Sequence, residues 1–268
     1  MHLNAEQIED LEKIYRINLI NSCSGYKSAN LIGTVSKKGE ENLAIFSSIT
    51  HLGSNPPLLG FFLRPTEIVP RHTYLNIKEK LFYTINSVQK NFAEKAHHTS
   101  AKYKRNISEF DITKLEAQYI NNFIAPYVKL SSIKIGMKFV EESKIKYNKS
   151  RLIVGKIVEL NVEDNIISKD GFINLNESQI ATISGCDGYS FPIKNERKGY
   201  QKPKKIWKKP SYRKKNALFV IFHLVGEKNG KEIGKMWFTV VKNAVKLEEA
   251  NIIFPNQLFE KNPLFKFD

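Results

Sequence analysis

The 268-residue sequence has few cysteines and no long apolar run. Cys23 and Cys186 are its only cysteines, which is typical of a reducing compartment and argues against a disulfide-stabilised fold. No stretch approaches the roughly 18 apolar residues of a membrane-spanning helix, and the first residues lack the basic-then-apolar pattern of a signal peptide. We therefore expect a cytoplasmic protein with no membrane partner.

Several motifs of familiar enzymes are also missing. No Gly-x-Gly-x-x-Gly follows a strand and opens a helix, so a Rossmann-type cofactor site has no support. The stretch from Gly226 to Lys231 is one residue short of a phosphate loop, and Glu232 stands where Ser or Thr is needed. The six histidines and two cysteines show no metal-ligand spacing. We expect no metal site and no catalytic acid, base or nucleophile.

The net charge of +15 is concentrated in one short segment. Residues 194–215 contain eleven Lys or Arg and one Glu, whereas residues 1–193 contain 24 basic and 20 acidic residues. The main body is therefore nearly balanced, and a basic face across the whole fold is not supported. We interpret 194–215 as a basic linker. Nucleic-acid binding by residues 202–215 is a less favoured alternative.

Apolar periodicity predicts mostly strands, with short helices between them. The expected strands are 29–35, 43–49, 58–63, 81–86, 129–140 and 152–162. The expected helices are 5–15, capped by Asn4 with Gln7, then 74–80 and 89–98, and residues 99–127 are mostly loop. Leu130 is among the inward-facing candidates, and Gly155 is a candidate β-bulge. This succession favours a mainly β fold, a β-barrel with added helices, over a doubly wound α/β sheet.

The C-terminal part has its own strand signals. Two apolar runs, 217–225 and 235–241, flank Asn229-Gly230, which is a strong hairpin signal. The chain after Lys246 resembles the start of a helix. The sequence therefore predicts three parts: a main domain over 1–193, the basic linker over 194–215 and a small C-terminal extension over 216–268.

Residues 42–76 contain the side chains that are best suited to binding a ligand. The small hydroxyl residues Ser47 and Ser48 allow backbone amides to approach the edge of a planar ring. Donors that suit a phosphate group are supplied by Arg64, Arg71, His72 and Thr73. If Thr73 is the N-cap of the 74–80 helix, the first amides of that helix add to the anion site. The alternative from spacing alone is a polar strand end, a proline turn and a capped helix.

Three motifs of this segment together resemble a known family. They are Asn42 with Ser47-Ser48, then Asn55-Pro56-Pro57-Leu58, then Arg71-His72-Thr73-Tyr74-Leu75-Asn76-Ile77. This combination resembles the flavin reductase-like family, whose fold is the FMN-binding split barrel with Greek-key-like strand order. The strands over 129–140 and 152–162 and the turn from Gly185 to Tyr189 also fit, so the resemblance covers about residues 20–190.

The resemblance implies FMN as cofactor, NADH or NADPH as co-substrate, and hydride transfer to the flavin. Ser47, Ser48 and the backbone around Ile49 and Thr50 would border the ring and the ribityl chain. The phosphate would be held by Arg71, His72 and Thr73, with Asn76 bracing the helix start and Arg64 near the flavin or its phosphate. The flavin accepts hydride directly, so this reaction needs no catalytic acid, base or nucleophile from the protein, and none is expected from the sequence.

The resemblance also implies a homodimer, and an electron-accepting partner protein is compatible with it. A rival interpretation is a flavin-binding electron carrier or sensor without turnover.

Overall fold

The computed structural model describes residues 1–67, 69–199, 201–202, 221–228, 231–241 and 244–250. The chain divides into two compact units, Met1–Lys198 and Gly199–Asp268. Of the predicted basic linker, residues 200 and 203–215 lie outside the described residues.

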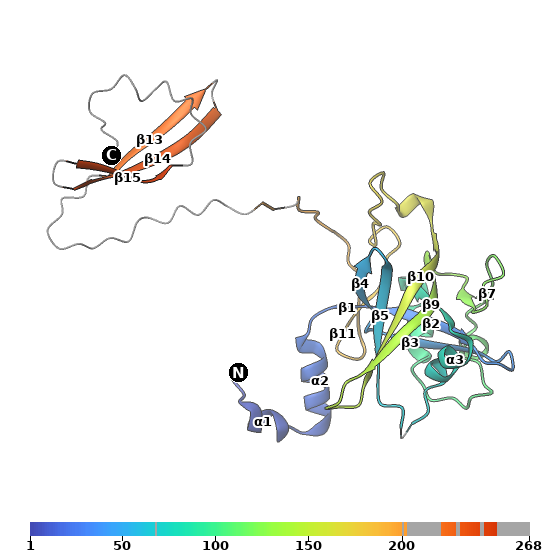
Figure 1. The fold of residues 1–268 in the computed structure, drawn as a ribbon. Helices are drawn as coiled ribbons and strands as arrows, with labels where there is room; N and C mark the ends of the chain where they lie inside the picture. The colour runs from blue at the N-terminus through green and yellow to red at the C-terminus, as the bar shows by residue number, and fades with distance from the viewer. Residues whose placement is uncertain (68, 200, 203–220, 229–230, 242–243, 251–268) are drawn as a thin grey trace. The chain divides into compact units, whose positions relative to one another are not determined.

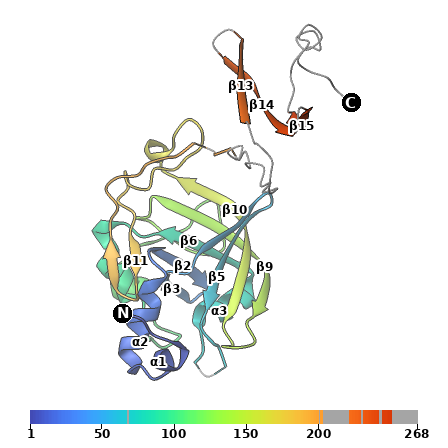
Figure 2. The same ribbon diagram turned by 90° about the vertical axis from the view of Figure 1, so that its left-hand side faces the viewer.

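The first unit is built around a seven-stranded antiparallel sheet in the order β3-β2-β6-β9-β10-β5-β4, as Figures 1 and 2 show. Its strands are β2 (Asn30–Val35), β3 (Glu41–Phe46), β4 (Thr50–Ser54), β5 (Pro57–Leu63), β6 (Phe82–Ser87), β9 (Ile133–Lys144) and β10 (Arg151–Val162). A second sheet in the order β1-β11-β12 contains β1 (Lys27–Ser28), β11 (Thr182–Ser184) and β12 (Gly188–Ser190). The strands β7 (Ala117–Gln118) and β8 (Tyr127–Val128) form a separate pair.

Short helices complete this unit. They are α1 (Ala5–Glu9), α2 (Lys13–Cys23), α3 (His72–Lys80), α4 (Ala93–His98) and α5 (Glu109–Thr113), with 3-10 turns η1 (Lys90–Phe92) and η2 (Asp164–Ile166). The prediction of a mainly β fold with added helices is confirmed. Within the described part of the chain, no helix is long and apolar enough to span a bilayer.

The β2 strand is buried on both faces of the sheet. Ile32 of β2 belongs to the cluster inside the curved sheet, together with Phe61, Tyr83 and other residues of β5, β6, β9, β10 and α3. Its neighbour Leu31 belongs to a second cluster, formed with α4, α5 and β11. Successive side chains of a strand point to opposite faces. The helices and the smaller sheet therefore cover the outer face of the β2–β3 edge, which is where the pocket described below opens.

Two local predictions are confirmed at atomic detail. Asn4 and Gln7 form the expected capping box at the start of α1, with each side chain accepting from the other residue's backbone amide at 2.9 Å. Gly155 lies at a register shift between β10 and β9, as predicted for a β-bulge.

The predicted helix over 5–15 is wrong in its extent. α1 ends at Glu9, and a new helix, α2, runs from Lys13 to Cys23. The break has a local cause, because the carboxylate of Glu12 accepts from the amides of Ile14 and Tyr15 at 2.8 and 2.9 Å and so caps a second helix start.

The boundaries of several other predicted elements also differ. The predicted strand over 129–140 begins later, at Ile133, so Leu130 lies before the strand and is half-exposed instead of facing inward. Pairing with β10 extends β9 to Lys144. The loop predicted over 99–127 contains the short helix α5 and the β7 strand, and Thr50–Ser54 forms the unpredicted strand β4. Such short elements are stabilised by tertiary contacts and leave little periodic signal.

The described residues of the second unit form an antiparallel sheet of β13 (Ile221–Lys228), β14 (Lys231–Val241) and β15 (Ala244–Ala250). β13 and β14 pair up to Lys228 and Lys231, while the predicted turn residues Asn229 and Gly230 lie outside the described residues. The helix start expected after Lys246 is wrong, because this segment pairs with β14 as a third strand.

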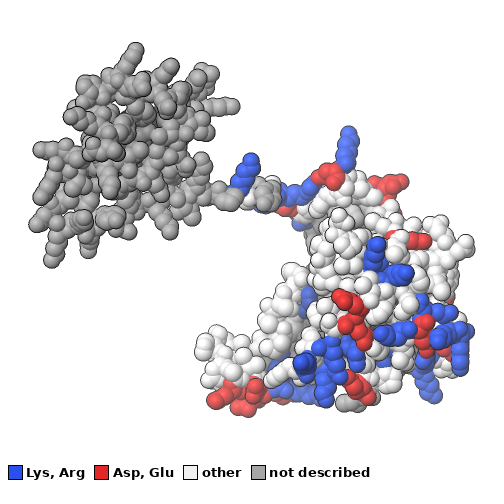
Figure 3. All heavy atoms as spheres, viewed as in Figure 1, with Lys and Arg blue, Asp and Glu red and all other residues white. Residues whose placement is uncertain are grey.

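The charge distribution on the first unit is mixed. Figure 3 shows Lys and Arg interspersed with Asp and Glu over the visible face of this unit. This agrees with the nearly balanced composition of residues 1–193.

Candidate functional site

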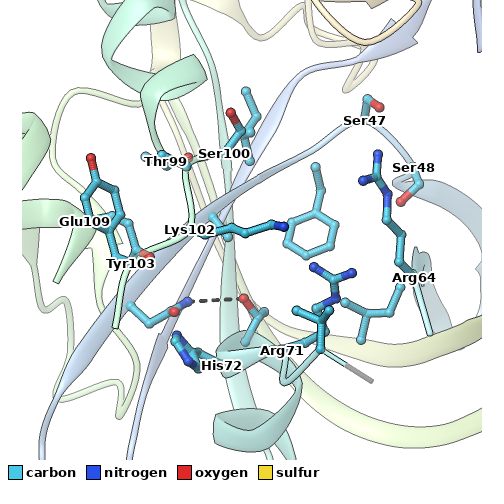
Figure 4. Close-up of a pocket in the computed structure, with 18 of the residues that line it drawn as sticks. Ser47, Ser48, Arg64, Arg71, His72, Thr99, Ser100, Lys102, Tyr103 and Glu109 are labelled. Carbon is cyan, nitrogen blue, oxygen red and sulfur yellow. Dashed lines mark hydrogen bonds between the residues drawn. The ribbon is translucent and has the colours of Figure 1, made fainter. Parts of the chain in front are cut away.

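A pocket of about 570 Å³ opens beside the β3 edge of the large sheet. It is lined by the end of β3 with Ser47 and Ser48, by the chain after β5, by the start of α3 and by the segment that follows α4 (Figure 4). This volume lies in the range of about 300–1,000 Å³ typical of small-molecule sites.

Three cationic side chains line this pocket: Arg64, Arg71 and Lys102. Figure 4 shows Lys102 and Arg71 directed toward the middle of the pocket, and Arg64 running along the side of Ser47 and Ser48. Within the described part of the chain, none of the three has a carboxylate oxygen within 4.0 Å of its charged nitrogens. Charges of one sign that converge without a directly paired carboxylate favour an anionic ligand.

Arg71 provides a more specific indication of an anion site. Its Nε atom is buried and has no hydrogen-bond partner among the described residues. Burial lowers the pKa of its guanidinium, and the positive charge of Arg64 lowers it further. A buried donor without a partner is costly, so a ligand acceptor at this point would relieve the cost.

Ser48 holds the rim of the pocket together. Its hydroxyl donates to the carbonyl oxygen of Phe62 at 3.0 Å and accepts from the amide of Phe62 at 3.1 Å. The Ser48 side chain therefore joins the chain after β3 to the end of β5. Its two hydrogen bonds to the backbone of Phe62 resemble those that a neighbouring strand would make. Ser47 also lines the pocket, and no hydrogen bond occupies its hydroxyl among the described residues.

Thr73 does not cap α3, and this prediction is wrong. The N-cap is Arg71, which makes no side-chain cap, and α3 begins at His72. The Thr73 hydroxyl, which is buried, accepts from the side-chain amide of Asn42 on β3 at 3.1 Å (dashed line in Figure 4). The first amides of α3 are thus left without a side-chain cap, which suits an anion at the helix start.

His72, the first residue of α3, lines the pocket (Figure 4). Burial lowers the pKa of its imidazole, as does the positive charge of Arg105, and Glu40 acts in the opposite direction. The ring is consequently neutral at neutral pH and offers one N–H donor.

Three of the predicted site residues do not line the pocket. Ile49 packs against the cluster inside the curved sheet, and Thr50 is an exposed residue of β4. Asn76 is buried, where it donates to the Thr34 hydroxyl at 3.1 Å and accepts from Arg105 at 3.4 Å. This arrangement ties α3 to β2, while the role of Asn76 in bracing the helix start stays a prediction.

One wall of the pocket was missed by sequence reasoning. The residues after α4, from Thr99 to Tyr103, lie against residues more than 25 positions earlier in the chain. The hydroxyl of Tyr103 is 2.6 Å from Nε2 of His98, and Arg105 pairs with Glu79 of α3 at 3.0 Å. The basic run that begins at Lys102 was the only signal for this wall within the sequence.

Glu109 of α5 is a second missed residue. It is buried and lines the pocket, and its Oε2 atom accepts from the amide of Leu43 at 2.9 Å. β3 is an edge strand, so this carboxylate satisfies an amide that has no strand partner. Burial raises the pKa of the Glu109 carboxyl group, while the hydrogen bond from Leu43 works against that rise.

Metal ligation has no basis in the described residues, which contain no group of three or more His, Cys, Asp or Glu able to hold an ion.

Comparisons with known proteins agree on one family. Residues 23–177 match the family model described as flavin reductase like domain. A protein from Shewanella frigidimarina, described as a flavin reductase with a split barrel domain, is 45% identical, with 75% of this chain and 100% of that chain covered and a TM-score of 0.72. No curated protein matches the chain.

More distant solved structures share the fold. The flavoredoxin of Desulfovibrio vulgaris is 19% identical, with 66% of this chain and 92% of that chain covered and a TM-score of 0.57. An FMN-binding protein from Thermus thermophilus is 14% identical, with 65% and 90% covered and a TM-score of 0.54. At these identities the likeness concerns the split-barrel fold alone.

Proposed function

Because the chain belongs to the flavin reductase-like family, we propose that it binds FMN in the pocket and transfers hydride from NADH or NADPH to the flavin. The observation that carries the proposal is the convergence of Arg64, Arg71 and Lys102 in one pocket, with the Nε atom of Arg71 buried and unpartnered among the described residues. These donors fit a phosphate dianion.

The residues of the pocket divide into two groups under this proposal. Arg64, Arg71 and the first amides of α3 would hold the phosphate, with the neutral ring of His72 as a further donor. Ser47 and the backbone beside Ser48 would border the flavin ring and its ribityl chain. The pocket volume and this donor set fit FMN.

The flavin, when bound, supplies the hydride chemistry. The chain's own residues bind and orient the reactants and limit the access of water. The wall from Thr99 to Tyr103 faces the start of α3 across the pocket, and Arg105 fastens it to Glu79 of that helix. This wall would shelter the reacting rings, since closure of a site against water suppresses competing reactions.

The first expected result is uptake of FMN by the purified protein. Equilibrium dialysis at micromolar protein should show retained FMN and a visible flavin spectrum, and addition of NADH or NADPH should then bleach that spectrum under anaerobic conditions. The initial rates with the two nicotinamides would identify the preferred one.

Each alternative outcome has a distinct meaning. A protein that retains no FMN at micromolar concentration would contradict the proposed function. Retention of FMN without bleaching by either nicotinamide would favour the carrier or sensor interpretation, and reduced FMN handed to a second protein would identify an electron-accepting partner.

We also propose a homodimer that forms through α2. This helix buries none of its residues, and Ile14, Ile17 and Ile20 recur every three positions with exposed fractions of 59%, 38% and 47%. A solvent-facing row of this kind is typical of a surface covered in an assembly.

The homodimer should appear by light scattering as twice the chain mass of 30.8 kDa. The Ile14→Asp variant should shift the mass toward that of one chain, because a buried unpaired carboxylate is costly. Tyr147→Asp is the matched control, since Tyr147 is 98% exposed in the turn between β9 and β10. A single-chain mass for the unaltered protein would contradict the proposal.

Two further parts of the proposal remain predictions. A cytoplasmic location is supported by Cys23 and Cys186, which are both free and exposed. Nucleic acid is not expected as a partner, although residues 203–215 of the basic segment lie outside the described residues.

A further inference from the structure

Arg151, at the start of β10, connects three elements around the pocket without lining it. Its Nε donates to the Thr66 hydroxyl at 3.2 Å, and its Nη2 lies 3.5 Å from a carboxylate oxygen of Glu67. Its Nη1 donates to Glu142 of β9 at 3.1 Å. The guanidinium also lies over the ring of Tyr74 in α3, 5.3 Å from the ring centroid. Its side chain is only 17% exposed, so these contacts are shielded from water.

These contacts lie close in the chain to the two arginines of the pocket. Thr66 and Glu67 follow Arg64 by two and three residues, and Tyr74 follows Arg71 by three. One guanidinium therefore contacts the chain between Arg64 and Arg71 and again just after Arg71. The guanidinium group of Arg151 is planar and rigid, which favours simultaneous contacts with several partners.

Glu67 is held from a second side. Its carboxylate accepts from Lys144 at the end of β9 at 2.5 Å. The hydrogen bond from Lys144 is the main reason that the pKa of Glu67 falls to about 2, so this carboxylate is charged at all ordinary pH values. Glu67 thus anchors the chain after β5 to the β9–β10 hairpin through two cations, Lys144 and Arg151.

An anchor is needed because the pocket holds like charges together. Arg64 and Arg71 both line the pocket and carry like charges, which repel each other. Among the described residues no carboxylate lies within 4.0 Å of either charged head. Without restraint, the segment carrying Arg64 would relax away from α3 and the donors would no longer converge.

We propose that Arg151 and Glu67 are positioning residues that hold Arg64 and Arg71 in converging positions and thereby set the affinity for the FMN phosphate without contacting it. This inference rests on the proposed function. It assigns part of the phosphate selectivity to an ion-pair network whose residues do not line the pocket.

The test compares FMN with riboflavin, which lacks the phosphate, on the full-length protein. Glu67→Gln keeps the shape of the side chain and removes its charge, and Arg151→Lys keeps the charge and removes the fork. Each variant should raise the dissociation constant for FMN about threefold to tenfold, which corresponds to the net contribution of one hydrogen bond. The constant for riboflavin should hardly change.

Glu116→Gln is the matched control. It breaks an exposed ion pair with Lys129, whose Nζ is 2.7 Å from the carboxylate, and Glu116 does not line the pocket. This variant should keep the FMN-to-riboflavin ratio of the unaltered protein. A general loss of stability would weaken both ligands together, so the ratio separates positioning from a merely structural role.

The outcomes distinguish this inference from the proposed function. Failure of the unaltered protein to retain FMN would overturn the proposed function and this inference with it. If the unaltered protein prefers FMN to riboflavin and Glu67→Gln and Arg151→Lys keep the same ratio, the inference alone is overturned.

Discussion

Replacement of Arg71 by alanine is expected to weaken FMN binding about tenfold to a hundredfold while leaving riboflavin binding nearly unchanged. A hydrogen bond to a charged group typically contributes about 1.5–3 kcal/mol, which corresponds to this range. Arg71 has the strongest claim to that contact, because its Nε atom is buried without a partner among the described residues. Isothermal titration of both ligands with both proteins measures the effect.

Arg197→Ala is a suitable control for this measurement. Arg197 is exposed, pairs with Asp170 at 2.7 Å and does not line the pocket, so its removal changes the net charge equally without touching the site. Equal losses for FMN and riboflavin in Arg71→Ala would contradict the prediction. They would mean that Arg71 supports the fold or the ring, and Arg64 would then be the next candidate for the phosphate anchor.

The Gly155→Ala substitution is expected to destabilise the barrel by about 1–3 kcal/mol, the usual cost of overfilling a packed interior. A Cβ at this position would lie 2.2 Å from the hydroxyl oxygen of Tyr83 and 3.0 Å from its Cζ atom. Tyr83 is fully buried, so its ring has little room to withdraw. Urea unfolding followed by circular dichroism gives the free energy of unfolding.

The same unfolding measurement on a Tyr83→Phe variant tests the role of the Tyr83 hydroxyl. This hydroxyl is buried and has no partner among the described residues, so Tyr83→Phe should raise the free energy of unfolding by about 1 kcal/mol or more. Gly155→Ala should then cost less when it is combined with Tyr83→Phe in a double variant than when it is made alone.

Tyr127→Phe is the control for Tyr83→Phe. Tyr127 is equally buried, but its hydroxyl donates to Glu159 at 2.9 Å, so the same change should lower stability by about 1 kcal/mol. If Tyr83→Phe were as destabilising as Tyr127→Phe, the Tyr83 hydroxyl would have to make a hydrogen bond in solution. That result would contradict the prediction that this hydroxyl has no partner.

Local signals were sufficient for much of the fold. The capping box of Asn4 and Gln7 and the bulge at Gly155 depend on residue types within a few positions, so the sequence predicts them directly. The same holds for the strands that alternate over six or more residues. Elements shorter than that, such as α5 and β4, carry too little pattern and form because the surrounding structure holds them.

Thr73 shows how a local rule can be overridden. A Thr before a helical pattern is a good N-cap, yet here its hydroxyl is taken by Asn42, which is 31 positions earlier in the chain. The helix therefore starts one residue before Thr73, and its first turn faces the pocket uncapped.

The sequence by itself determined the mainly β class, because that class follows from periodicity, and its motifs carried the family resemblance that singled out the candidates from Ser47 to Thr73. Tertiary structure alone decided that the wall from Thr99 to Tyr103 and the carboxylate of Glu109 complete the pocket. The bond from Leu43 to Glu109 spans 66 positions. A contact of that separation forms only when the edge of β3 and α5 meet in space, and no local pattern specifies it.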